Sequence, residues 1–230
     1  IFVTTKGLQE SFSFINTQLG SNVKLNEELL TQFTKLREVS GLTNEELYGA
    51  TQLQLTSNKT LNQITGEILA QAKITSANNG VILNEKEILK DIKDVSAATT
   101  LSLGKNPAAI AEAVTQAKAL GMTLGQVEKI AESLLNFESS ITSELKAELL
   151  LGRDINLEQA RLFALNNKIS DVAKEISSQI GDSADFAKMN VLQQKALAEA
   201  VGMSREELAK TLFVQENLGA ATGDEAIKRK

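Results

Sequence analysis

The sequence predicts an all-α protein, in which multiple helices are joined by short Gly, Asn and Ser turns. The 230 residues include a single Pro and are rich in Ala, Leu, Glu, Lys and Gln, which are good helix formers. Apolar residues recur at spacings of three and four, as they do on one face of a helix. No stretch alternates with period two for long enough to indicate a strand.

Six helices are expected in the first half of the chain, because apolar residues recur with helical spacing and most candidates begin at a capping residue or end near Gly or Asn. Thr43 and Glu46 have the spacing of a capping box, in which each side chain bonds the other's free backbone N–H. Pro107 follows Asn106, and Pro is favoured at the first helical position. The predicted ranges are 7–19, 26–39, 43–56, 58–78, 84–103 and 106–121.

A long central helix is predicted over 123–151, and we expect it to carry a packing seam similar to that of a coiled coil. Its apolar residues are spaced by three and four, and the helix would be about 43 Å long. The seam could pack on the returning helix of the same chain or between copies in an assembly. The seam residues are Val127, Ile130, Leu134, Phe137, Ile141, Leu145 and Leu149.

After a glycine turn, the remaining helices are predicted over 156–165, 170–180, 190–201 and 204–216. The polar end of the chain is expected to be loose. This pattern divides the chain into an N-terminal helical segment (1–80), a helical unit that contains the long helix (81–152), a C-terminal helical unit (153–218) and a tail (219–230). Because the chain begins at Ile1 and not at Met, we expect it to be part of a longer protein.

An internal repeat of about 80 residues is indicated by three similar turns. Their glycines, Gly41, Gly121 and Gly202, lie 80 and 81 residues apart in the numbering. At each turn a helix ends at Gly, a Leu or Met packs over the turn, and Ser or Thr caps the next helix with Glu or Gln three residues on. We interpret these glycines, together with Gly152, as repeat turns.

The composition excludes most catalytic and metal sites. Without Cys or His, the chain has no thiolate nucleophile, no histidine base and no usual zinc ligands. We therefore predict a protein that is not an enzyme, with no catalytic, cofactor-binding or metal-binding residues and no cofactor. The formal net charge of −5 disfavours a surface that binds duplex phosphates. No apolar run approaches the ~20 residues that span a bilayer, so no transmembrane segment is expected.

Two pairs of carboxylates are spaced i, i+4 within the predicted long helix, as catalytic acids could be. The pairs are Glu128 with Glu132 and Glu144 with Glu148. Because such pairs on a helix usually face solvent, we interpret them as a solvated face.

A second pattern, over residues 201–212, looks like the turn of a helix-turn-helix DNA reader. The helix that follows carries Glu206 and Glu207, whose carboxylates would repel phosphates. A helix-turn-helix DNA binder is therefore the less favoured alternative, and we expect no specific readout of nucleic acid.

Three segments resemble helical parts of bacteriophage tail tape-measure proteins and related virion proteins. They are 119–141 (ALGMTLGQVEKIAESLLNFESSI), 144–158 (ELKAELLLGRDINLE) and 189–208 (MNVLQQKALAEAVGMSREEL), within a resemblance that covers 105–213. Proteins of that family are long, helical and present in several copies. They occupy the tail-tube lumen during assembly, set tail length and leave with the genome.

The resemblance implies a non-enzymatic structural protein of the phage tail, made in the cytoplasm of the host bacterium. Its expected partners are copies of itself, as a homo-oligomer, and proteins of the tail tube or tail tip. The alternative is a helical adaptor or scaffold that docks on tail or portal proteins without measuring length.

Overall fold

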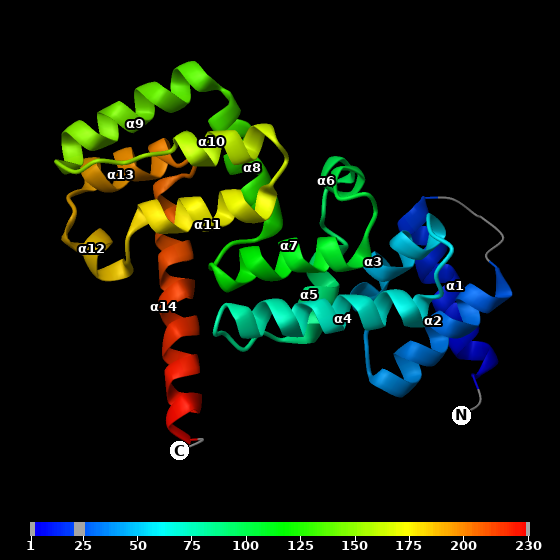
Figure 1. The fold of residues 1–230 in the computed structure, drawn as a ribbon. Helices are drawn as coiled ribbons and strands as arrows, with labels where there is room; N and C mark the ends of the chain where they lie inside the picture. The colour runs from blue at the N-terminus through cyan, green and yellow to red at the C-terminus, as the bar shows by residue number, and fades with distance from the viewer. Residues whose placement is uncertain (1–2, 21–25, 229–230) are drawn as a thin grey trace. The chain divides into compact units, whose positions relative to one another are not determined.

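The computed structural model describes residues 3–20 and 26–228, with side chains up to residue 220. This part of the chain forms fourteen helices and no strand, which confirms the all-α fold class (Figure 1). Contacts between residues group the chain into two compact units, 1–74 with 83–112 and 75–82 with 113–230. This grouping differs from the three consecutive segments expected from the sequence.

The first unit holds α1 to α3, α5 and α6, with most of α4 and the start of α7. The helices are α1 (Thr5–Leu19), α2 (Glu27–Ser40), α3 (Asn44–Leu55), α4 (Leu61–Asn78), α5 (Glu85–Ile92), α6 (Ala97–Ser102) and α7 (Pro107–Ala119).

The second unit holds the last turn of α4, the end of α7 and all later helices. These are α8 (Leu124–Leu135), α9 (Phe137–Leu151), α10 (Glu158–Leu165), α11 (Ile169–Ile180), α12 (Ser183–Lys188), α13 (Val191–Ala200) and α14 (Arg205–Lys228).

The core of the first unit forms where α1, α2 and α3 pack together and α3 packs against α5. Phe14 stacks on Phe33 with ring centroids 6.4 Å apart and meets Tyr48 edge-on at 6.0 Å. Such offset and edge-to-face pairs add to the hydrophobic stabilisation of a buried cluster. The largest aliphatic side chains of the first unit, all buried, are Ile15, Leu47, Leu61, Ile64, Ile68, Ile88, Leu89 and Ile110.

Gly49 lets α3 approach the end of α5. A Cβ at this position would lie 2.7 Å from the backbone nitrogen of Lys93 and 2.9 Å from Ile92 Cγ2. Gly49→Ala is therefore expected to lower the free energy of unfolding of this unit by about 1–3 kcal/mol, because the backbones must move apart. Urea titration followed by circular dichroism measures the change.

Gly66, in α4, is the matched control because a Cβ there has nothing within 4 Å. Gly66→Ala is expected to raise the free energy of unfolding by about 0.5–1 kcal/mol, since Ala loses less conformational freedom in a helix. If Gly49→Ala were as stable as the wild type, the close approach of α3 and α5 would be wrong.

The second unit is organised around α8, α11 and α13. Helix α8 packs on α10 and α11, α9 lies along α13, and α14 packs on α13 and α12 (Figure 1). Asn79 and Gln116 exchange two side-chain hydrogen bonds, at 3.0 and 2.9 Å, and so satisfy both amides. The fully buried side chains of this unit include Val127, Ile155, Leu157, Val172, Ile176, Ile180, Leu197 and Leu208.

The capping chemistry predicted at the three similar turns is present. Thr43 and Thr123 close capping boxes with Glu46 and Gln126. At the third turn the Ser204 N–H donates to Glu207 Oε2 at 2.8 Å and the Glu207 N–H donates to Ser204 Oγ at 3.2 Å. The side chains predicted to pack over these turns are buried: Leu42, Met122 and Met203.

The predicted repeat turns adopt the left-handed backbone that favours glycine. The φ angles are 62° at Gly41, 73° at Gly121, 66° at Gly152 and 75° at Gly202. The helices that follow the boxes are not all alike, because α3 and α8 have 12 residues each and α14 has 24. The 80-residue repeat as a unit of structure is therefore not confirmed and stays a prediction.

The predicted long helix over 123–151 is wrong as a single helix. It breaks at Asn136, whose φ of −80° and ψ of 79° lie outside the helical region, into α8 and α9. Asn competes poorly for helix interiors because its side chain bonds nearby backbone groups in other conformations. The residues after it, Ser139, Ser140, Thr142 and Ser143, are also weak helix formers.

Three other boundaries differ from the prediction. The helix expected over 84–103 is two helices, because Ser96 caps α6 by accepting the Thr99 N–H at 3.1 Å. The short helix α12 was not predicted, and Asp182 caps it by accepting the Asp185 N–H at 2.7 Å. Helix α14 continues to Lys228 instead of ending near Glu216.

Candidate functional site

Helix α9 buries small and polar side chains and exposes large apolar ones, which is the opposite of the usual arrangement in an amphipathic helix. Ser140, Glu144 and Ala147, spaced by four and three residues, are its buried residues. They form one helical face, while α9 as a whole lies along α13. On α13, Ala196 and Ala200 are also buried, so small side chains allow the two helices to approach closely.

Polar contacts reinforce the attachment of α9 to α13. Lys146 Nζ lies 3.0 Å from Glu199 Oε2, and Gln193 Nε2 donates to the Leu150 carbonyl oxygen at 2.9 Å. The hydrogen bond from Lys146 lowers the pKa of the Glu199 carboxyl. These contacts hold α9 in one orientation on α13, so they also determine which side of α9 faces away from the core.

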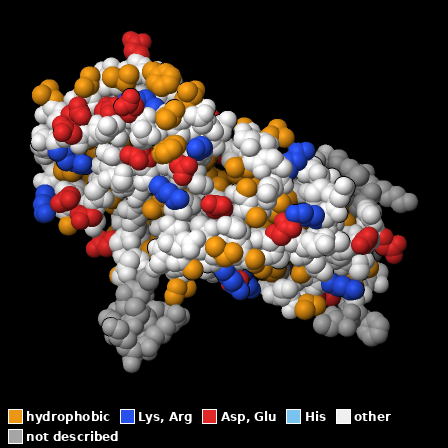
Figure 2. All heavy atoms as spheres, in the orientation of Figure 1, with side chains coloured by type: hydrophobic (Ala, Val, Ile, Leu, Met, Phe, Trp, Pro, Cys, Tyr) orange, Lys and Arg blue, Asp and Glu red, His pale blue; other side chains and the backbone are white. Residues whose placement is uncertain are grey.

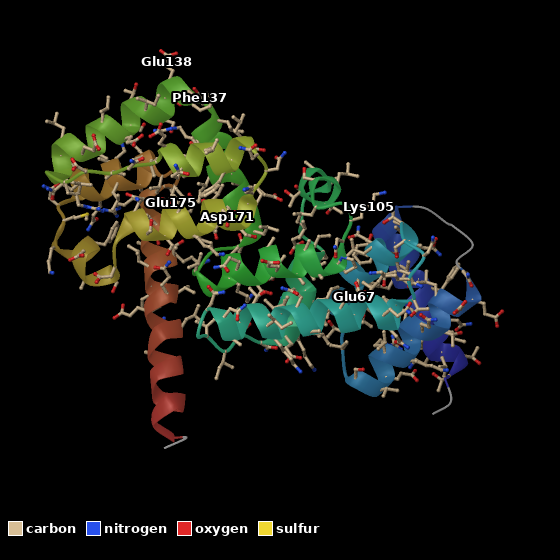
Figure 3. The ribbon with its side chains drawn as sticks, in the orientation of Figure 1. Glu67, Lys105, Phe137, Glu138, Asp171 and Glu175 are labelled. Carbon is tan, nitrogen blue, oxygen red and sulfur yellow. The ribbon has the colours of Figure 1, made fainter. Side chains whose placement is uncertain are left out.

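On the outer side, α9 exposes a row of large apolar residues. Phe137 is 48% exposed, Ile141 44%, Leu145 59% and Leu149 84%. Figure 2 shows hydrophobic side chains gathered over α9 with acidic side chains beside them, and Figure 3 shows Phe137 at the start of the helix. Steps of four residues keep the row on one side over about 18 Å of helix. Rows of this kind mark interaction surfaces more often than scattered single residues do.

Helix α10 and the loop before it form the second wall of a groove beside this row. Leu162 and Leu165 of α10 are 49% and 60% exposed. Together with Phe137, Ile141 and Leu145 they line a hollow of about 750 Å³. We call this hollow the α9–α10 groove.

A buried ion pair forms the floor of the groove. Glu144 Oε2 lies 2.6 Å from Arg161 Nη2, and Glu144 Oε1 accepts the Leu157 N–H at 2.9 Å. Arg161 Nη1 donates to Ser140 Oγ at 3.0 Å. Because each charge has its partner and further hydrogen bonds, the network fixes α10 against α9.

The rim of the α9–α10 groove is acidic. Its lining residues include Glu148, Asp154 and Glu158, whereas Arg161, already paired with Glu144, is the only Lys or Arg among them. Glu148 Oε1 accepts the Ile155 N–H at 3.0 Å, which fixes one carboxylate at the edge. The groove therefore combines an apolar interior with a negative border.

The structure divides the predicted seam between two environments. Val127, Ile130 and Leu134 of α8 are in the core, whereas the four seam residues of α9 line or extend the α9–α10 groove. They therefore do not form one continuous seam on one helix. The break at Asn136 separates the two sets.

Two of the glycines predicted as repeat turns also lie at close approaches. A Cβ on Gly121 would lie 2.6 Å from the Thr211 carbonyl oxygen, and one on Gly202 would lie 2.9 Å from Ser133 Cβ. In contrast, Gly41 has only the flexible end of Lys86 near it, and Gly152 has nothing within 4 Å. The first two glycines thus have a packing role that the sequence pattern did not indicate.

Sequence reasoning missed the floor and one wall of the groove. Glu144 was expected on a solvated face but is buried, where it pairs with Arg161 of α10. Arg161 also bonds Ser140, from which it lies 21 residues away in sequence. Leu162 and Leu165, two apolar residues of the helix predicted over 156–165, are exposed. Nothing in the local pattern identifies these positions, since they depend on how α9 and α10 meet.

The helix-turn-helix pattern corresponds to α13, a short turn and α14. Glu206 and Glu207 occupy the first turn of α14. Hydrogen bonds from Ser204 hold the pKa of the Glu207 carboxyl below its usual value. A carboxylate at this position opposes contact with phosphate.

Within the described residues, no group of three or more Asp or Glu side chains is placed to hold a metal ion. No described helix is both long and apolar enough to cross a membrane. Comparisons with protein-family models, with curated proteins and with solved structures find no match to this chain.

Proposed function

We propose that this chain is a non-enzymatic structural protein of a phage particle, similar to a tail tape-measure protein, that acts by packing its helices against other chains. The observation that carries the proposal is the outward apolar row of α9, because this helix buries Ser140, Glu144 and Ala147 and leaves its large side chains outside. A row of this kind is costly in water and is stabilised when another chain covers it.

The setting in a phage tail rests on the resemblance of residues 105–213 to tape-measure and related virion proteins. In that role the chain would occupy the tail lumen with copies of itself, contact tail tube or tail tip proteins, and assist tail-length control and genome delivery. Its ordered helices would supply packing surfaces and no chemistry.

The break at Asn136 favours a second candidate, a helical adaptor that docks on tail or portal proteins. A ruler gains from long continuous helices, whereas α9 has 15 residues and is therefore about 22 Å long. Short helices packed in compact units suit docking better than measuring.

Quantitative mass spectrometry of purified particles tests the proposal and separates the two candidates. A few copies per tail are expected for the tape-measure role, and one copy per subunit of a ring is expected for the adaptor. A chain that is missing from particles and stays free in the cytosol contradicts both.

A further inference from the structure

We propose that the α9–α10 groove binds an amphipathic α-helix of a different protein, with an apolar row flanked by Lys or Arg. The inference rests on the proposed role in assembly and adds the chemistry of the partner. It follows from three properties of the groove, which are its apolar walls, its satisfied floor and its acidic rim.

The walls suit a helix in a groove. Such complexes place apolar residues at i, i+3 or i+4 and i+7 of one helix into a hydrophobic cleft of another protein. Phe137, Ile141 and Leu145 of α9 line the hollow together with Leu162 and Leu165 of α10. The row from Phe137 to Leu149 spans about 18 Å, which matches roughly three turns of a partner helix.

The ion pair at the floor of the groove does not need a charged group from the partner. The carboxylate of Glu144 and the guanidinium of Arg161 bind each other at 2.6 Å, and Leu157 and Ser140 complete their hydrogen bonds. An apolar side chain can therefore lie over the pair without leaving a buried charge unpaired.

The rim selects the sign of the partner's charge. Glu148, Asp154 and Glu158 border the groove with no Lys or Arg beside them in its lining apart from the paired Arg161. Lys or Arg residues that flank the partner's apolar row would meet these carboxylates, as charge complementarity at interfaces requires.

The same rim disfavours a second copy of this surface. In a two-fold dimer the same patch meets itself, so the three carboxylates of one copy would lie near those of the other. Like charges brought together in this way oppose association. The groove therefore fits a basic helix from another protein better than a self-contact.

A synthetic peptide tests the proposal on the full chain. The probe is a fluorescein-labelled helix of about 16 residues with Leu at i, i+3, i+4 and i+7 and Lys beside them, and the control peptide replaces every Lys with Glu. Fluorescence anisotropy should show saturable binding of the Lys peptide that weakens as salt rises. Equal binding of the Glu peptide, or no binding of the Lys peptide, would overturn the proposal.

Matched variants locate the binding surface. The double variant Leu145→Ser and Leu165→Ser changes one exposed residue on each wall, with 59% and 60% exposure. It should raise Kd at least about tenfold. The control double variant Leu101→Ser and Ile82→Ser, at residues 63% and 57% exposed outside the groove, should leave Kd unchanged. Equal effects of the two double variants would overturn the proposal.

Charge variants test the rim separately. Asp154→Asn with Glu158→Gln should raise Kd and reduce its dependence on salt, because two carboxylates at the rim lose their charge. An unchanged salt dependence would contradict the charge argument. A wild-type dimer in sedimentation analysis that the Leu145→Ser and Leu165→Ser variant abolishes would show that a second copy fills the groove instead.

The peptide result is independent of particle composition. If the chain is missing from particles but the Lys peptide binds, the phage role fails and the groove assignment stands. If the chain is present in particles and neither peptide binds, the groove assignment fails and the structural role stands.

Discussion

Leu134→Asp is expected to unfold the second unit. Leu134 is 1% exposed in α8, which packs on α10 and α11. An aspartate there would bring an unpaired carboxylate into an apolar interior and remove a large side chain, with an expected cost of more than about 4 kcal/mol. This is comparable with the total stability of many domains, about 5–15 kcal/mol. Circular dichroism and urea titration should show a large loss of helix at room temperature.

Glu132→Gln is the matched control for this substitution. Glu132 lies two residues earlier on α8 and is exposed. Its change is expected to alter the free energy of unfolding by less than about 0.5 kcal/mol. A folded and stable Leu134→Asp variant would mean that α8 does not pack as described. A large functional loss from Glu132→Gln with the fold intact would instead point to an active site at this carboxylate.

Glu144→Ala is expected to lower the free energy of unfolding by about 3–5 kcal/mol. The substitution removes the carboxylate and so leaves the buried charge of the Arg161 guanidinium without its partner. It also removes the acceptor of the Leu157 N–H. Both side chains of the pair are nearly buried, with 11% and 12% of their area exposed, so water compensates little. Urea titration measures the loss.

The variant Glu144→Gln with Arg161→Leu separates the ion pair from simple packing. It removes both charges, and the Gln side chain keeps an oxygen that can accept the Leu157 N–H. We expect it to be more stable than Glu144→Ala by at least about 2 kcal/mol, because no buried charge is left unpaired. If the double variant were no more stable than Glu144→Ala, the pair would not be the source of the cost.

Local chemistry in the sequence predicted much of the fold. Thr43, Thr123 and Asn106 were identified as helix starts from their side chains and spacing, and each accepts the expected backbone hydrogen bond. The breaks at Asn136 and Ser96 were missed, because an apolar spacing of three and four continues through both. At each of these two positions, one short polar side chain is the only local sign in the sequence of a helix boundary.

The groove could be predicted only in part. The apolar spacing identified Phe137, Ile141, Leu145 and Leu149 as one row, but the sequence could not say which side of α9 would be buried. That choice depends on Ala147 of α9 and on Ala196 and Ala200 of α13, which lie about fifty residues apart in sequence. The Glu144–Arg161 pair depends likewise on the meeting of α9 and α10.

The copy number of groove variants in purified particles tests the central claim most directly. Wild-type chain, the Leu145→Ser and Leu165→Ser variant, and the Leu101→Ser and Ile82→Ser control would each be produced during infection and counted by quantitative mass spectrometry. If assembly uses the α9–α10 groove, particles should contain the wild type and the control at equal copy number and the groove variant at a much lower one. Equal incorporation of all three chains would contradict the claim that this groove packs the protein into the particle.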